Sequence, residues 1–271
     1  IRRFLKDVED GQYDHYVDLG VATFPLYNPA MRRALKLPDN SMSVLVTDVT
    51  PTGACEGTLK PGDVLISIDD HEIDSAGQIL IDGEKVDLNE VVERKFAGDT
   101  VKLKWQNKDG VHEKDVALKP LPPARMYAIQ YEKKPRYIVF AGLVFQPLDT
   151  NLFASVKFDD VNVRRLYSDY VPKGIFTERQ DIVLLTRVES DPINSQLGDF
   201  SGLAVDKING VTVKSLKHAD ELLHPATPPE FHVIELFGAP RPVIIPANAV
   251  DAANERVKKT YAIERLSNFT E

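Results

Sequence analysis

Residues 59–70 read LKPGDVLISIDD and hold the most informative pattern in the chain. The Pro61-Gly62-Asp63 step is typical of a tight turn, and the apolar, β-branched run after it is typical of a buried strand. Upstream, residues 44–51 read VLVTDVTP and predict another strand, bounded by a proline. Further upstream, Leu19-Gly20-Val21 predicts the opening of a third strand at a glycine. The first half of the chain is therefore expected to be rich in strands.

The same reasoning extends to both sides of this pattern. Residues 101–105 alternate apolar and polar side chains and turn at 107–110 into a partner strand at 116–118. Helices are expected at 29–35, with Asn28 as N-cap before a proline, and at 89–96. Residues 1–10 carry apolar side chains at helical spacing, which predicts a short helix with one apolar face.

Leu121-Pro122-Pro123 interrupts the pattern and predicts a domain boundary. After it, strands are expected at 137–145 (a pair), 182–188, 204–208, 231–237 and 243–245, and helices at 161–170, 216–223 and 247–259. The two halves resemble one unit repeated. Residues 47–49 correspond to 186–188, residues 68–73 to 208–213, and residues 19–21 to 141–143, in the same order. The second unit carries an insertion around 161–170, and the first carries one at 74–87.

Composition limits the class of protein. The 271 residues include 43% hydrophobic and 27% charged residues, which allows a buried core and excludes a disordered or collagen-like chain. The longest run without a polar side chain, residues 138–145, is far shorter than the roughly 20 residues of a membrane-spanning helix. The net charge of −8 argues against a nucleic-acid surface. No signal peptide is visible, and the single cysteine, Cys55, has no cationic neighbour in sequence, which predicts an inert thiol.

Three segments in this order resemble a PDZ domain of the bacterial and organellar HtrA/Deg serine proteases: Φ-Gly-Φ at 18–21, V-x-V-T-x-V-x-P at 44–51, and L-K-x-G-D-V-L-I-S-I-D-D at 59–70. Residues 137–148 and 205–211 look like the divergent second PDZ domain of plant-type Deg proteases. Residues 4–13 resemble the helix and linker that leave the trypsin-like domain in that group.

The resemblance implies a mainly β fold with helices (α+β). It contains two PDZ-like domains, each a small, partly open β-barrel or sandwich capped by helices. Residues 1–12 are then the helix and linker from a missing upstream domain, and 13–122 are the first PDZ domain. Residues 123–271 are the divergent second PDZ-like domain, with an insertion and a closing C-terminal helix.

A PDZ domain binds an extended peptide as an added strand, usually at the peptide's free C-terminus. Successive N–H groups of the Φ-Gly-Φ turn can converge on one carboxylate. In the first unit the predicted peptide-binding residues are Leu19, Gly20, Val21, Ala22, Thr23 and Phe24, with Leu88, Val91 and Val92 as apolar walls. In the second unit the candidate groove consists of Ala141, Gly142 and Leu143 facing Leu216, Ala219 and Leu223. An assembly role is preferred for that second unit, because its insertion and closing helix could fill the groove.

No catalytic or metal-binding residues are expected in this chain, and no cofactor. Residues 198–202 read GDFSG, but the extra phenylalanine breaks the spacing around a trypsin-like nucleophile. Residues 69–72 are rich in ligand side chains, but their alternation favours a strand and turn. The basic segment 133–136 is interpreted as a solvated loop, with an acidic partner contact as the alternative.

The resemblance implies the regulatory and substrate-recognition part of an HtrA/Deg-type serine endopeptidase. It would bind C-termini or extended segments of unfolded protein substrates for quality control and aid assembly into a homo-oligomer. Its partners would be those substrates and an upstream protease domain, in a periplasmic or otherwise exported compartment. The alternatives are a free-standing peptide-binding adaptor without protease activity and a structural protein with both grooves closed. The helix expected at 1–10 favours the protease-region hypothesis over the adaptor, because a free-standing adaptor does not need a helix whose apolar face has no partner.

Overall fold

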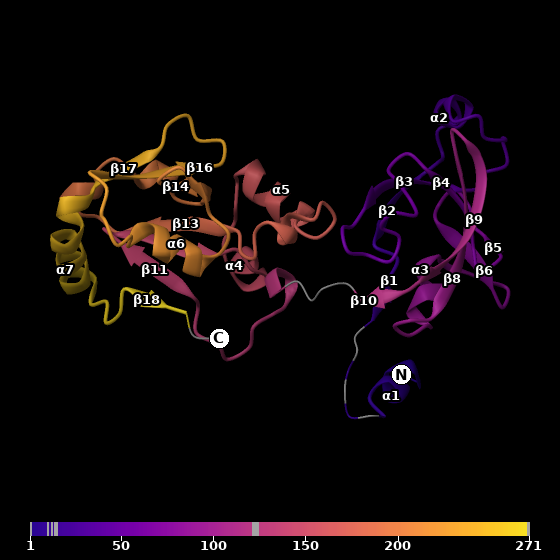
Figure 1. The fold of residues 1–271 in the computed structure, drawn as a ribbon, viewed down its shortest axis with the longest axis horizontal. Helices are drawn as coiled ribbons and strands as arrows, with labels where there is room; N and C mark the ends of the chain where they lie inside the picture. The colour runs from indigo at the N-terminus through magenta and orange to yellow at the C-terminus, as the bar shows by residue number, and fades with distance from the viewer. Residues whose placement is uncertain (1, 10, 12, 14–15, 121–124, 270–271) are drawn as a thin grey trace. The chain divides into compact units, whose positions relative to one another are not determined.

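A computed structural model describes residues 2–9, 11, 13, 16–120 and 125–269 (Figure 1). The chain divides into two compact units. The first comprises residues 1–123 together with 171–174, and the second comprises 124–170 together with 175–271. The predicted boundary at 121–123 lies outside the described residues. Each unit is built around its own buried apolar cluster, so each is described separately.

Where the structure describes it, the first unit consists of strands with three helices (Figure 1). Its elements are α1 (Arg2–Asp7), β1 (Val17–Asp18), β2 (Val21–Pro25), α2 (Pro29–Ala34), β3 (Val44–Val49), β4 (Val64–Ile68), β5 (His71–Glu72), β6 (Gln78–Ile81), β7 (Glu84–Asp87), α3 (Asn89–Glu93), β8 (Thr100–Asn107), β9 (Gly110–Ala117) and β10 (Lys119–Pro120). The main sheet is antiparallel in the order β2-β3-β4-β8-β9, with β5 paired to β4. Strands β1 and β10 form a separate pair.

Local chemistry explains where several of these elements begin and turn. Asn28 caps α2 as predicted, because its side-chain oxygen accepts from the N–H groups of Ala30 and Met31. The insertion at 74–87 forms the β6–β7 hairpin, which the sequence pattern did not predict. Helix α3 ends at Glu93 and is shorter than the helix expected at 89–96. In α1, the apolar side chains of Phe4 and Leu5 remain exposed. The helix contacts the rest of the unit through Arg3, whose Nε donates to the carbonyl of Lys95.

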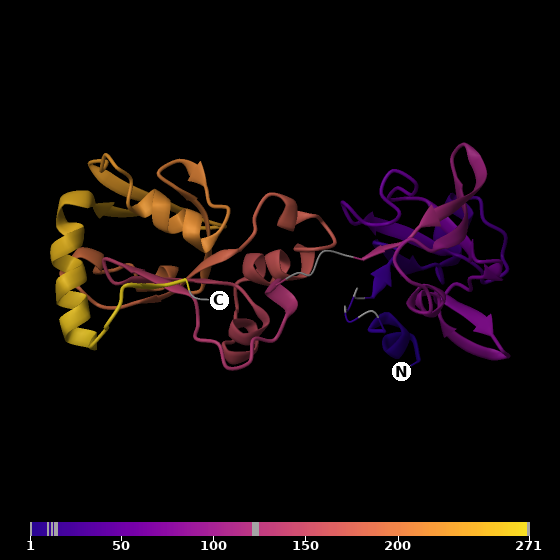
Figure 2. The ribbon, with the colours of Figure 1, turned by 60° about the horizontal axis from the view of Figure 1, so that its bottom comes forward.

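The second unit carries longer helices around one larger sheet (Figure 2). Its elements are η1 (Arg125–Tyr127), β11 (Tyr137–Phe140), β12 (Leu143–Pro147), α4 (Thr150–Ser155), α5 (Val161–Asp169), η2 (Ile175–Thr177), β13 (Val183–Val188), η3 (Pro192–Asn194), η4 (Gly198–Phe200), β14 (Leu203–Ile208), β15 (Val211–Thr212), α6 (Leu216–Leu223), β16 (Phe231–Leu236), β17 (Val243–Pro246), η5 (Ala247–Ala249), α7 (Val250–Tyr261) and β18 (Ser267–Asn268). The sheet order is β17-β16-β14-β13-β12-β11-β18, with β15 paired to β14.

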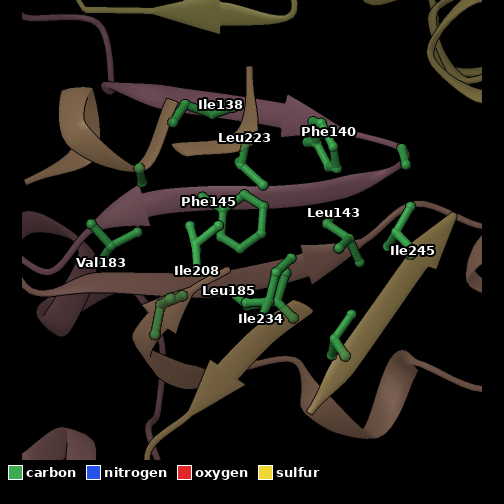
Figure 3. Packing of buried hydrophobic residues seen from close by; sticks show 14 of the residues in the cluster. Ile138, Phe140, Leu143, Phe145, Val183, Leu185, Ile208, Leu223, Ile234 and Ile245 are labelled. Atoms are coloured by element: carbon green, nitrogen blue, oxygen red, sulfur yellow. The ribbon is translucent and has the colours of Figure 1, made fainter. Parts of the chain in front are cut away.

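The core of the second unit lies between this sheet and α6 (Figure 3). Phe145 of β12, Leu185 of β13 and Ile208 of β14 are fully buried and meet Leu223 of α6. Both α6 and α7, which lie where the sequence predicted helices, present an apolar stripe at helical spacing to this cluster. The fold class is therefore confirmed as α+β, with open sheets rather than closed barrels.

The two units share details of geometry that support the predicted repeat. The hydroxyl of Thr47 donates to the carbonyl of Ala22, and the hydroxyl of Thr186 donates to the carbonyl of Val144. In both units the acceptor is the second residue after the turn glycine. A register shift follows each of those acceptor residues. The turns 69–70 and 209–210 both have two consecutive residues with positive φ. Such turns suit the twist of a tight hairpin, so the two units use the same local device.

Among the described residues, no helix combines the length and the apolar character that a membrane span requires.

Candidate functional site

The predicted carboxylate-binding turn of the first unit lies between β1 and β2. Gly20 has φ +69, which an L-residue adopts only with strain, and a Cβ there would lie 3.0 Å from the Cα of Gly53. The Gly20 carbonyl accepts from the N–H of Thr50 at 2.7 Å. The Gly20 N–H donates to Oδ1 of Asp18 at 2.6 Å. A carboxylate of the chain itself therefore already binds one of the three predicted donors.

Strand β2 runs along the edge of the first sheet, because β3 is its neighbour on one side and no described strand pairs with the other. Along an antiparallel strand, the backbone N–H and C=O groups of one residue point toward the partner strand and those of the next residue point away from it. Since Gly20 accepts from Thr50, the N–H and C=O of Val21 face away from β3. Val21 and Ala22 are half-buried, whereas Thr23 and Phe24 are exposed. This edge presents unpaired backbone groups to an incoming strand.

The predicted apolar walls belong to the core of the first unit. Leu88, Val91 and Val92 are all buried and pack in the same cluster as Leu19. A hollow of about 220 Å³ does lie next to α3, between Tyr16, Val17 and Asp18 on one side and Asn89, Val92 and Glu93 on the other. Two of its six lining side chains are carboxylates, so the hollow is unfavourable for an anion.

The buried Cys55 lies close to this turn, and its N–H donates to the carbonyl of Leu19. Burial raises the pKa of the Cys55 thiol to about 12, and the nearby charge of Asp18 acts in the same direction. A thiol that is fully protonated and buried is a poor nucleophile. This agrees with the prediction of an inert cysteine.

The corresponding turn of the second unit, Ala141-Gly142, is held by two asparagines. The N–H of Ala141 donates to Oδ1 of Asn254 on α7 at 2.7 Å. Nδ2 of Asn194 donates to the carbonyls of Ala141 and Glu189, at 2.8 and 2.7 Å. Both asparagines are buried. The closing helix therefore supplies a polar side chain to the backbone group that was predicted to bind a peptide carboxylate.

The edge of β12, which corresponds to the edge of β2, is covered by the chain's own strand β11. On its far side β11 pairs with β18 (Figure 1). The predicted groove residues meet inside the core rather than across an open groove, because all five of the apolar side chains are buried: Ala141, Leu143, Leu216, Ala219 and Leu223. The two units thus differ at the place where a peptide strand would add.

An ion pair between Asp191 and Arg256 fixes the loop that carries Asn194, which is bonded to this turn. Asp191 caps η3, and Arg256 of α7 donates to both of its carboxylate oxygens at 2.7 and 2.8 Å. The hydrogen bonds from Arg256 hold the pKa of the Asp191 carboxyl below its usual range. Helix α7 therefore contacts this region through three polar residues, Asn254, Arg256 and Tyr261, in addition to its apolar stripe.

Replacing Asn254 by alanine is expected to destabilise the second unit by about 2 kcal/mol, because the buried N–H of Ala141 loses its acceptor. Urea unfolding followed by far-UV circular dichroism measures the change. The matched control is Glu255→Ala, the exposed neighbour on the same helix, which is expected to change stability by less than about 0.5 kcal/mol. Equal effects of the two substitutions would contradict the role assigned to Asn254.

Two histidines flank Phe140 in the second unit, with ring centroids 4.9 Å (His232) and 5.6 Å (His224) from it. Burial lowers the pKa of His232, and the neighbouring His224 lowers it further. The hydrogen bond with Asp220 raises the pKa of His224. His232 therefore contributes stability that is present above its ordinary pKa of 6.5 and is lost as the pH falls. His224 contributes stability that is present below 6.5 and is lost as the pH rises.

These opposing contributions predict that His224→Gln makes stability more sensitive to acid. Between about pH 7.5 and about pH 5.5, the unfolding free energy of the second unit should fall further in this variant than in the unmodified chain. Urea midpoints at the two pH values measure the difference, and His71→Gln in the first unit is the control. A variant whose midpoint falls no more than that of the unmodified chain would contradict the prediction.

The sequence motifs that suggested catalysis or metal binding have structural partners. The hydroxyl of Ser201 donates to the carbonyl of Thr186 at 2.8 Å. Asp69 and Asp70 lie in the turn between β4 and β5, paired with Lys95 at 2.7 Å and Lys102 at 2.5 Å. Over the ranges that the structure describes, no group of three or more His, Cys, Asp or Glu side chains could hold a metal ion.

The residues that sequence reasoning missed are the polar ones that bind the two turns: Asp18, Asn194 and Asn254. One of them had a local signal, because an aspartate two residues before a glycine is a frequent Asx turn. The other two come from distant segments and have no signal at the turn itself.

A family profile described as "PDZ domain" matches residues 127–267, which is more than half of the chain. The chain therefore belongs to the PDZ domain family.

Its relatives are Deg/HtrA proteases. The chain is 33% identical to "Protease Do-like 2, chloroplastic" of Arabidopsis thaliana over 82% of its length, and 30% identical to "Protease Do-like 4, mitochondrial" of the same plant, also over 82%. These matches cover only 37% and 41% of the two relatives. A "Serine protease DegP homolog" of Plasmodium falciparum is 25% identical over 63% of the chain and 19% of that relative. A solved structure of an HtrA-type protease with a decapeptide shares 24% identity, covers 45% of this chain and 35% of that one, and has a TM-score of 0.34.

Proposed function

We propose that this chain is the substrate-recognition region of a Deg-type serine endopeptidase, and that its first unit binds extended segments of unfolded proteins. The observation that carries the proposal is the contrast between the two edges. Strand β2 has no partner on its outer side among the described strands, whereas β12 is covered by β11. Peptide addition to an exposed edge uses main-chain hydrogen bonds, so it accepts many sequences. That breadth suits the recognition of damaged substrates.

The second unit has a different proposed role. Its equivalent edge and turn are already bonded by β11 and Asn254, so a peptide strand cannot add there as it can at the edge of β2. We assign it to assembly of the full-length protein or to contacts within it. The named compartments of the relatives, chloroplast and mitochondrion, support an organellar or exported location. Proteolysis in quality control is proposed for the full-length protein, by analogy with those relatives.

Backbone methylation of a peptide tests strand addition without changing the protein. In an added antiparallel strand, alternate N–H groups point to the edge of β2. N-methylating that alternate set in an extended decapeptide should weaken binding to the 271-residue chain about tenfold, and methylating the other set should have little effect. Fluorescence anisotropy measures both affinities. Equal losses for the two sets, or no loss for either, would rule out strand addition.

A further inference from the structure

A cavity of about 430 Å³ in the second unit has a lining rich in basic residues. It is bounded by η1, the loop 130–136, the end of β12, helix α4 and residues 180–181. Four of its lining residues are cationic and two are acidic, on a chain whose net charge is −8. The volume falls in the range of ligand sites, roughly 300–1,000 Å³. We name it the basic hollow.

The acidic residues of the basic hollow are already engaged. Asp181 accepts from both terminal nitrogens of Arg136, at 2.7 and 3.2 Å, and from the N–H of Leu216 at 3.0 Å. Asp149 caps α4 by accepting from the N–H of Leu152 at 2.8 Å. These bonds use the carboxylates for structure and leave them little capacity to neutralise further cations.

Lys133 and Lys134 are two of the four cationic residues that line the hollow, and the other two are Arg125 and Arg136. Both lysine side chains are exposed, and neither has a carboxylate partner among the described residues. Each ammonium is a point charge on a flexible stem, unlike the planar fork of an arginine that holds a phosphate or carboxylate through two bonds. Arg136, which has that fork, is already bonded to Asp181. The hollow is therefore suited to several spaced negative charges rather than to one compact anion.

The remaining lining residues suit a peptide. Pro135 and Leu152 give apolar surface against which side-chain stems can pack, and Gln146 and Gln180 give polar groups. We propose that the basic hollow binds an acidic peptide segment, with its Asp or Glu carboxylates at Lys133 and Lys134. This site is separate from the edge of β2 and does not depend on the function proposed for that edge.

The test uses the 271-residue chain and a fluorescent octapeptide that alternates glutamate with apolar residues. Replacing both lysines by glutamine, Lys133→Gln with Lys134→Gln, should weaken binding about tenfold, because two exposed ion pairs with the peptide are lost. The matched control is Lys214→Gln with Lys217→Gln, two exposed lysines of the same unit outside the hollow. The control should bind the peptide as tightly as the unmodified chain does.

Three outcomes would overturn the proposal. The first is equal binding of a peptide in which glutamine replaces every glutamate. The second is equal weakening by the control pair, which would indicate nonspecific attraction. The third is displacement of the peptide by inorganic phosphate at concentrations comparable to those of the peptide, which would indicate a site for a small anion. Loss of peptide binding on raising the salt concentration would support the proposal, because exposed ion pairs are screened.

Discussion

Replacing Gly142 by alanine is expected to destabilise the second unit by about 3 kcal/mol or more, one of the two largest effects predicted for this chain. Gly142 has φ +82, and a Cβ at this position would lie 2.3 Å from Nδ2 of Asn194 and 2.4 Å from the carbonyl oxygen of Glu189. Real Cβ atoms essentially never make such contacts. To relieve them, Asn194 must give up its two hydrogen bonds, which leaves the buried carbonyl of Ala141 and the partly buried carbonyl of Glu189 without this donor.

The matched control for Gly142→Ala is Gly210→Ala. Gly210 also has positive φ, +77, but nothing lies within 4 Å of a Cβ at that position. The control therefore carries only the backbone strain, about 1 kcal/mol. Urea unfolding followed by circular dichroism compares the two variants. Trp105, the only tryptophan, lies in the first unit, so its fluorescence follows that unit separately. Equal losses in the two variants would show that close packing at Gly142 is not the cause.

Much of the fold was predictable because its determinants are local. Turn residues, β-branched runs and the Asn28 cap act over a few positions, and such local patterns located most strands and the three longest helices of the second unit, α5, α6 and α7. The prediction of a repeat rested on short matched segments, and in both units the threonine of one such segment, Thr47 or Thr186, donates to the carbonyl of the second residue after the turn glycine. Geometry of this kind leaves a signature in adjacent residues.

The candidate site was less predictable, since its state depends on contacts between distant segments. The apolar pattern of residues 137–145 predicts a pair of strands, and it does not say that β11 occupies the edge where a peptide would add. The contact between Ala141 and Asn254 joins residues 113 positions apart. In the first unit, Leu88, Val91 and Val92 are apolar in either role, so sequence alone could not distinguish core from pocket wall.

Removing the carboxylate of Asp18 is expected to give the first unit a preference for free C-termini. In the unmodified chain, Asp18 accepts from the Gly20 N–H, and Glu93 adds a second negative charge at the neighbouring hollow. A peptide with a free terminal carboxylate should therefore bind no more than about threefold tighter than its amide. In Asp18→Ala the donor is free, and the free acid should bind about thirtyfold tighter than the amide, because hydrogen bonds to charged groups are worth about 1.5–3 kcal/mol.

Asp18→Asn separates the two effects of this side chain. The amide oxygen can still accept from the Gly20 N–H, but the negative charge is gone, so the preference for the free acid should stay small, near threefold. Anisotropy titrations of one peptide pair, acid and amide, against the three proteins measure all these ratios. If the unmodified chain already lost most of its affinity on amidation, Asp18 would have to leave Gly20 when a peptide binds. The turn would then read C-termini directly. A small ratio in all three proteins would mean instead that the Gly20 donor contributes nothing to recognition, and that strand addition along β2 accounts for all of the binding.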